Sequence, residues 1–115
     1  MKFVNLTPHA INVLDEGGNV ILSLPPSGEV ARVDSRRTLV GRLGPVPVFK
    51  TVFGDVVGLP DPRPDTVFVV STLVLSALAS KGVTRDDIVA PDTSPQGAVR
   101  DAEGRIIGVR GFQRL

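Results

Sequence analysis

Turn signals divide this sequence into short segments, and they limit its fold more than any other feature. Glycines and prolines total 12 and 10 in 115 residues, and many lie in turn-forming groups such as residues 15–19, 25–28 and 44–45. Apolar, β-branched runs recur between them roughly every 8–12 residues, a spacing typical of short strands. The sequence therefore predicts about eight to ten short strands rather than a helical bundle.

The expected strands and the turns between them predict which segments pair. They cover residues 3–6 with their continuation 10–14 after Pro8, and then 20–24, 29–33, 38–43, 47–53, 56–59, 66–70, 88–90, 99–100 and 105–109. Tight turns within 15–19 and 102–104 predict two hairpins. Residues 54–55 are expected to form a turn, and three prolines within 60–65 predict a rigid surface loop. The nearly unbroken apolar run 66–70 predicts a central strand buried on both faces.

One stretch has the pattern of a helix. Ser71 is the expected N-cap of a helix from Thr72 to about Lys81, and Gly82 is the expected stop. Its apolar stripe would comprise Leu73, Val74, Ala77 and Leu78. The sequence thus predicts the α+β class: a β-rich curled sheet or small barrel-like domain with one main α-helix packed on it. By length, residues 1–115 are expected to form a single domain.

Composition excludes several functional classes. Without cysteine the chain has neither disulfides nor thiolate metal sites, and nothing in the sequence signals a cofactor. A net charge of +1 and the absence of Trp and Tyr disfavour nucleic acid as a partner. Neither a signal peptide nor about 18 consecutive apolar residues is visible, so we expect a cytoplasmic protein without a membrane partner.

The run Asn5-Leu6-Thr7-Pro8-His9 contains the sole histidine and is the first candidate site. His9 is a structural residue, a ligand contact or a catalytic acid or base. The sequence contains no second histidine and no cysteine that could complete a catalytic or metal site with His9. Asn5 and Thr7 either close a local turn or contact a ligand.

Three further segments could bind an anion or a polar ligand. Ser27 and Arg32 flank a glycine turn, and Ser71 with Thr72 marks a strand-to-helix junction where backbone N–H groups are free. The polar loop at 92–97 resembles a ligand lid. Each has a plain structural alternative: a turn, an N-cap or a flexible loop. The predicted ligand-binding set is Asn5, Thr7, His9, Ser27, Arg32, Ser71, Thr72, Asp92, Gln96 and Arg100.

Several motifs together resemble a family of small proteins encoded by bacteriophages and prophages. They are Asn5-Leu6-Thr7-Pro8-His9, residues 26–33, Phe53-Gly54-Asp55-Val56-Val57-Gly58-Leu59-Pro60, Val70-Ser71 and residues 99–112. The resemblance runs nearly end to end, and it implies a phage protein acting in the host cell without specifying catalytic residues. Small accessory phage proteins include sponges that sequester nucleotide immune signals.

The leading hypothesis is therefore non-enzymatic binding of a small phosphorylated, nucleotide-derived immune signal, which would counter host defence in the host cytoplasm. Arginines outnumber lysines ten to three, and the guanidinium fork suits phosphate. Pockets in proteins this small often form between subunits, so a homo-oligomer is expected. The alternatives are a phage structural or assembly protein, and a nucleotide-cleaving enzyme that uses His9.

Overall fold

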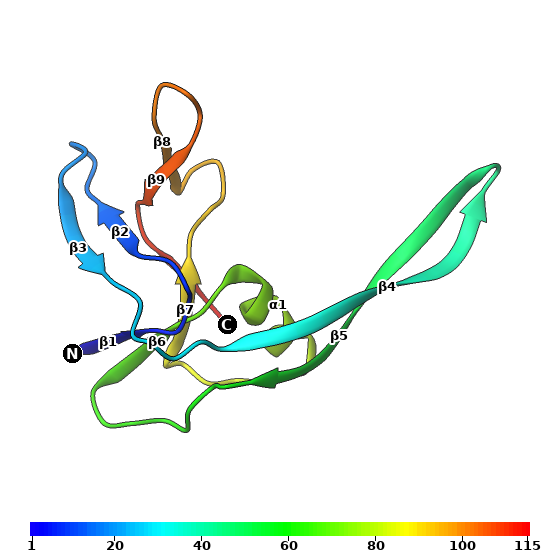
Figure 1. The fold of residues 1–115 in the computed structure, drawn as a ribbon, viewed down its shortest axis with the longest axis horizontal. Helices are drawn as coiled ribbons and strands as arrows, with labels where there is room; N and C mark the ends of the chain where they lie inside the picture. The colour runs from blue at the N-terminus through cyan, green and yellow to red at the C-terminus, as the bar shows by residue number, and fades with distance from the viewer.

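Short strands dominate the structure, a computed structural model that describes residues 1–115 (Figure 1). The elements are β1 (Lys2–Asn5), β2 (Ile11–Leu14), β3 (Val20–Leu24), β4 (Arg32–Leu43), β5 (Val46–Val57), β6 (Thr66–Val69), α1 (Thr72–Ser80), β7 (Ile88–Pro91), β8 (Ala98–Arg100), β9 (Ile106–Val109) and β10 (Phe112–Arg114). With 48% strand and 8% helix, the predicted β-rich α+β class is confirmed.

The strands form three sheets. One has the order β1-β6-β7-β10, in which β1, β6 and β7 are parallel and β10 is antiparallel to β7. The second has the order β3-β2-β9-β8 and contains both predicted hairpins, β2–β3 and β8–β9. The third is the β4–β5 pair alone. No sheet closes into a barrel, so of the two predicted architectures the curled sheets are found.

Strand β6 lies at the centre of the core, as the apolar run predicted. Phe68 and Val69 are both fully buried but point to opposite faces of the sheet. Phe68 belongs to the cluster formed with Val74 and Leu78 of α1. Val69 belongs to a second cluster with β2, β3 and β9. Helix α1 therefore covers one face of the first sheet, and the second sheet packs on the other.

Helix α1 begins where the sequence predicted. The Ser71 hydroxyl accepts a hydrogen bond from the Val74 backbone N–H at 3.2 Å, and Gly82 follows the helix with a φ of +74°. One assignment is corrected: Leu73 is 46% exposed, whereas Leu75 is buried. The helix is rotated so that its buried stripe runs through positions 74, 75, 77 and 78, which places Leu73 on the solvent side.

The middle of the chain differs most from the prediction. Residues 29–33, 38–43, 47–53 and 56–59 were expected to form four short strands, but β4 and β5 are two continuous strands of 12 residues each. Residues 54–55, where a turn was expected, lie within β5. The pairing is irregular there, because Val33 of β4 pairs with Val56 whereas Ser35 pairs with Phe53. The hairpin projects from the rest of the molecule (Figure 1). We call residues 35–54 the β arm.

The second half of the chain shows one smaller difference and one predicted feature. The C-terminal residues Phe112–Arg114 form β10 and pair with β7, although no strand was predicted there. The predicted loop at 60–65 is present, and Arg85 holds it by donating a hydrogen bond to the Pro60 carbonyl at 2.9 Å.

Candidate ligand-binding groove

The candidate groove lies where three parallel strands end. Strands β1, β6 and β7 run in the same direction, so the segments that follow them emerge at one edge of the sheet. These segments carry His9, Ser71 with Thr72, and Thr93. Ligand sites in open sheets of parallel strands are commonly found outside the carboxyl ends of the strands.

Two adjoining hollows make up this groove, which we call the His9 groove. The first has a volume of about 330 Å³ and is lined by Thr7, Pro8, His9, Ile11, Ser71, Thr72, Pro91 and Thr93. The second, of about 300 Å³, shares four of these residues and adds Ala10, Asn12, Ile106, Ile107, Gly108 and Val109. Each volume is at the lower end of the range for small-molecule sites. Four predicted residues, Thr7, His9, Ser71 and Thr72, therefore meet in one place.

Asn5 holds the turn that carries Thr7 and His9, but it is not one of the residues that line the groove. Its side chain is buried, and Nδ2 donates to the carbonyls of His9 (2.8 Å) and Leu24 (3.0 Å). Its Oδ1 accepts from the backbone N–H of Thr7 (3.0 Å) and from the Thr7 hydroxyl (2.7 Å). Both donors and both lone pairs of the amide are then occupied. The local-turn interpretation accounts for Asn5, and no atom of its side chain is left for a ligand.

Thr7 and His9 contribute to the groove in different ways. The Thr7 hydroxyl lies within hydrogen-bonding distance of Asn5 Oδ1 and of the His9 carbonyl, and Thr7 is only 6% exposed. It therefore serves mainly to hold the turn. The His9 side chain is exposed and makes no hydrogen bond within the chain. His9 is consequently the side chain of the predicted motif that is free to meet a ligand.

The N-terminus of α1 is the part of the groove whose chemistry suits an anion. The Ser71 hydroxyl is engaged by the Val74 N–H, and the Ser71 carbonyl accepts from the Leu75 N–H at 3.0 Å. The N–H groups of Thr72 and Leu73 belong to the first helical turn and have no acceptor within the helix. The helix dipole adds partial positive charge at the same end.

The loop after β7 is less of a lid than the sequence predicted. Asp92 Oδ1 accepts from the Ser94 N–H (3.1 Å) and from Gln113 Nε2 (3.0 Å). The hydrogen bonds from Ser94 hold the pKa of the Asp92 carboxyl below its ordinary value. Asp92 thus ties the loop to β10. Of this loop only Thr93 lines the groove, and Gln96 is exposed outside it.

Three other predicted residues lie outside the groove. The Ser27 hydroxyl donates to the Asn5 carbonyl at 2.7 Å, which fastens the 25–28 turn to the end of β1. Arg32 is exposed at the start of β4, opposite Val57. Arg100 donates to the Gly104 carbonyl at 2.6 Å within the β8–β9 hairpin. The predicted anion site at Ser27 and Arg32 is therefore not assembled by these contacts.

Sequence reasoning missed the apolar side of the groove. Ile11, Pro91, Ile106 and Ile107 line it but were interpreted only as strand residues. The available signal was positional: Pro91 and Thr93 follow a short apolar strand, as Ser71 does. That signal becomes useful only if the three strands are known to be parallel, which local patterns do not reveal.

Comparisons with protein-family models, with curated proteins and with solved structures find no match to this chain. Within the structure, no group of three or more His, Asp or Glu side chains gathers in a way that could hold a metal ion. Helix α1, the one helix present, is too short to cross a bilayer.

Proposed function

We propose that this protein binds and sequesters a small phosphorylated, nucleotide-derived ligand in the His9 groove without cleaving it. The observation that carries the proposal is the convergence of His9 with the N-terminus of α1 at the carboxyl ends of β1, β6 and β7. Helix N-termini in this position bind phosphate groups through backbone N–H groups.

The two sides of the groove suit the two halves of such a ligand. A phosphate would accept hydrogen bonds from the Thr72 and Leu73 N–H groups, with the His9 imidazole as a further donor. A base or ribose would lie against Ile106 and Ile107, whose side chains are about half exposed. Apolar surface with a few convergent polar groups is the usual composition of a small-molecule site.

Binding is favoured over cleavage by what surrounds His9. No carboxylate, lysine or arginine lines either hollow, so no second side chain of these kinds is available there to share acid–base chemistry with the imidazole. The role in countering host defence, and action in the host cytoplasm, follow from the resemblance to phage proteins and form part of the proposal.

Calorimetric titration with a panel of cyclic dinucleotides and ADP-ribose derivatives tests the proposal. One class should bind, and His9→Gln should weaken it about tenfold or more, since a hydrogen bond to a charged group contributes about 1.5–3 kcal/mol. Arg100→Gln, in the β8–β9 hairpin outside the groove, is the matched control and should bind normally. The ligand should be recovered intact after the protein is denatured.

Two results would count against this function. If nothing in the panel binds, the groove is not a nucleotide site. If a bound ligand is converted to product and His9→Gln abolishes the conversion, the protein is an enzyme and the sponge hypothesis is wrong.

A second candidate function is a structural or assembly role in the phage particle. The β arm favours it, because the arm exposes apolar side chains, among them Leu39, Leu43 and Val46, that no other part of the chain covers. This candidate predicts that the protein co-purifies with assembled virions and that shortening the arm abolishes this association.

A further inference from the structure

The β arm is unsupported by the rest of its own chain. Only the base of the hairpin packs on the core, where Val33 and Val56 touch the α1 cluster. Beyond the base, Val40 is 58% exposed, Leu43 74% and Val46 57%. An isolated two-stranded hairpin is at best marginally stable in water. A hairpin of this length with exposed apolar side chains therefore indicates a surface that covers it.

Apolar side chains occur on both faces of the arm. Leu39 and Phe49 are register partners and share one face, where the Arg37 guanidinium lies 4.3 Å from the centre of the Phe49 ring. Leu43 and Val46 are also register partners, and they occupy the opposite face because Val46 is an odd number of positions from Phe49 on the same strand.

The charge of the arm points to the kind of surface that covers it. Residues 35–54 contain Arg36, Arg37, Arg42 and Lys50 and no acidic residue. Since the whole chain has a net charge of +1, the other residues together carry −3. Two arms lying side by side would bring eight positive charges together, which is unfavourable. An arm lying on the body of another copy would instead meet the opposite charge.

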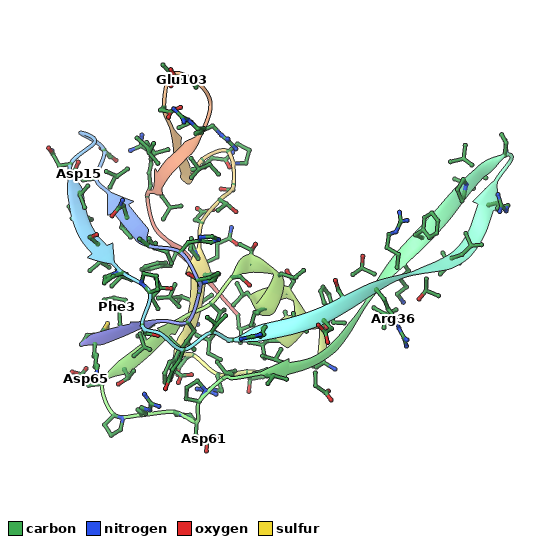
Figure 2. The ribbon with its side chains drawn as sticks, viewed as in Figure 1. Phe3, Asp15, Arg36, Asp61, Asp65 and Glu103 are labelled. Carbon is green, nitrogen blue, oxygen red and sulfur yellow. The ribbon has the colours of Figure 1, made fainter.

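The sheet β3-β2-β9-β8 has the complementary features. It exposes Val20, Ile21, Ile106 and Ile107 by 46–64%. Its two hairpin turns carry four acidic residues: Asp15 and Glu16 in one, and Asp101 and Glu103 in the other. Arg105 already pairs with Asp101 at 3.2 Å and with Glu103 at 3.5 Å, so the excess negative charge of the sheet is that of the Asp15–Glu16 turn. Figure 2 shows Asp15 and Glu103 far from Arg36. The arm points away from this sheet (Figure 1), so the arm of the same molecule does not reach it.

The contact area favours a reciprocal arrangement. Nine residues per strand give the arm a length of about 30 Å, and two strands are about 10 Å wide, so one face offers about 300 Å². Covering one face buries about 600 Å² counted on both partners, well below the roughly 1,200–2,000 Å² of stable interfaces. Two arms exchanged around a two-fold axis reach about 1,200 Å², and a two-fold axis is the commonest symmetry of dimers.

We propose that the β arm of one copy packs on the β3-β2-β9-β8 sheet of a second copy, and the reverse, to form a two-fold dimer. The apolar residues of the arm meet those of the sheet, and its arginines meet the acidic turns. The dimer does not require the proposed ligand, but Ile106 and Ile107 also line the His9 groove, so the arm and the ligand would compete for these two residues.

Charge exchange tests this arrangement. Sedimentation velocity should show a dimer for the natural sequence at micromolar concentration. Arg36→Glu/Arg37→Glu, which removes the net positive charge of the arm, and Glu16→Lys/Glu103→Lys, which removes the net negative charge of the turns, should each weaken the dimer at least about tenfold, because the attraction between arm and turns is then lost. Native mass spectrometry of the two variants mixed should show a heterodimer, since one arm–sheet contact then has its natural charges and the other sets the two new glutamates against the two new lysines.

The outcomes are separated by two controls. Far-ultraviolet circular dichroism should be the same for all variants, because every exchanged residue is exposed. Arg63→Glu/Arg114→Glu, with the same change of net charge outside the arm, should dimerise like the natural sequence. A natural protein that stays monomeric into the submillimolar range overturns the proposal. It is equally overturned if both charge variants dimerise normally, or if folded variants remain monomeric when mixed.

Discussion

Replacing Asn5 by aspartate should destabilise the protein far more than the same change elsewhere. The substitution is nearly isosteric and keeps Oδ1, which accepts from the Thr7 N–H and hydroxyl. It replaces the Nδ2 amide by an oxygen that faces the carbonyls of His9 and Leu24, at 2.8 and 3.0 Å in the natural protein. Two hydrogen bonds thereby become two oxygen–oxygen repulsions in a site that is 3% exposed.

The magnitude follows from these contacts. The two buried carbonyls lose the amide that satisfied them, at a cost of about 1–3 kcal/mol each, or about 2–6 kcal/mol together. The His9 carbonyl is partly buried and also lies 3.0 Å from the Thr7 hydroxyl, so this hydroxyl and water can recover part of that cost. We expect a net loss of about 3–4 kcal/mol at neutral pH, a large share of the roughly 5–15 kcal/mol that stabilises a domain.

Urea unfolding followed by far-ultraviolet circular dichroism measures this loss, because the chain has no Trp or Tyr to report by fluorescence. Asn12→Asp is the matched control. Asn12 Oδ1 accepts from the exposed Ser23 hydroxyl at 2.9 Å, and a carboxylate can accept the same bond. The control should therefore change the free energy of unfolding by less than about 0.5 kcal/mol.

The pH dependence provides a second check. Burial and the facing carbonyls disfavour ionisation, so the new carboxyl should have a raised pKa in the folded state. Its penalty is then greatest at neutral pH and shrinks as the pH falls towards about 4, where a protonated carboxyl can donate to one carbonyl. Equal losses for Asn5→Asp and Asn12→Asp, or a loss independent of pH, would refute the account of Asn5 as the hydrogen-bonding centre of the turn.

Two further predictions concern the scaffold around the groove. The Arg85 guanidinium pairs with Asp87 at 2.7 and 2.9 Å and lowers the pKa of that carboxyl below 3.8. Asp87→Asn should therefore cost about 1.5–3 kcal/mol of unfolding free energy at pH 7. Urea unfolding at several pH values should show that the natural protein loses this stabilisation as the pH falls below 3.8 through the lowered pKa. Gly97→Ala should cost about 1–3 kcal/mol in the same assay, because a Cβ there would overlap the carbonyl and carboxyl of Asp92, whereas Gly111→Ala, with open space around it, should be nearly neutral.

Much of the local structure could be predicted because it depends on residues close together in the chain. The β2–β3 and β8–β9 hairpins follow from turn residues between apolar runs, and the start of α1 follows from the capping hydroxyl of Ser71. The burial of β6 on both faces follows from its unbroken apolar run. In each case the controlling interaction spans only a few positions.

The candidate groove could be predicted only in part. The run from Asn5 to His9 and the junction at Ser71 and Thr72 were recognisable, and they do meet. The sequence could not show that Ser27 and Arg100 lie outside the groove. Their polar side chains are hydrogen-bonded to the carbonyls of Asn5 and Gly104, and a sequence does not distinguish such a side chain from one that is free to bind a ligand. The apolar wall was missed for the complementary reason that half-exposed isoleucines resemble core residues.

The sequence by itself determined where the chain turns, where its helix begins and which strand is most deeply buried, since these depend on backbone preferences and on local apolar pattern. Only the tertiary structure decided that β1, β6 and β7 run parallel, which brings His9 to the helix N-terminus across more than 60 residues of chain. It also decided that β4 and β5 extend without interruption into an arm. Strand pairing is a long-range choice among many similar apolar segments, and no local signal encodes it.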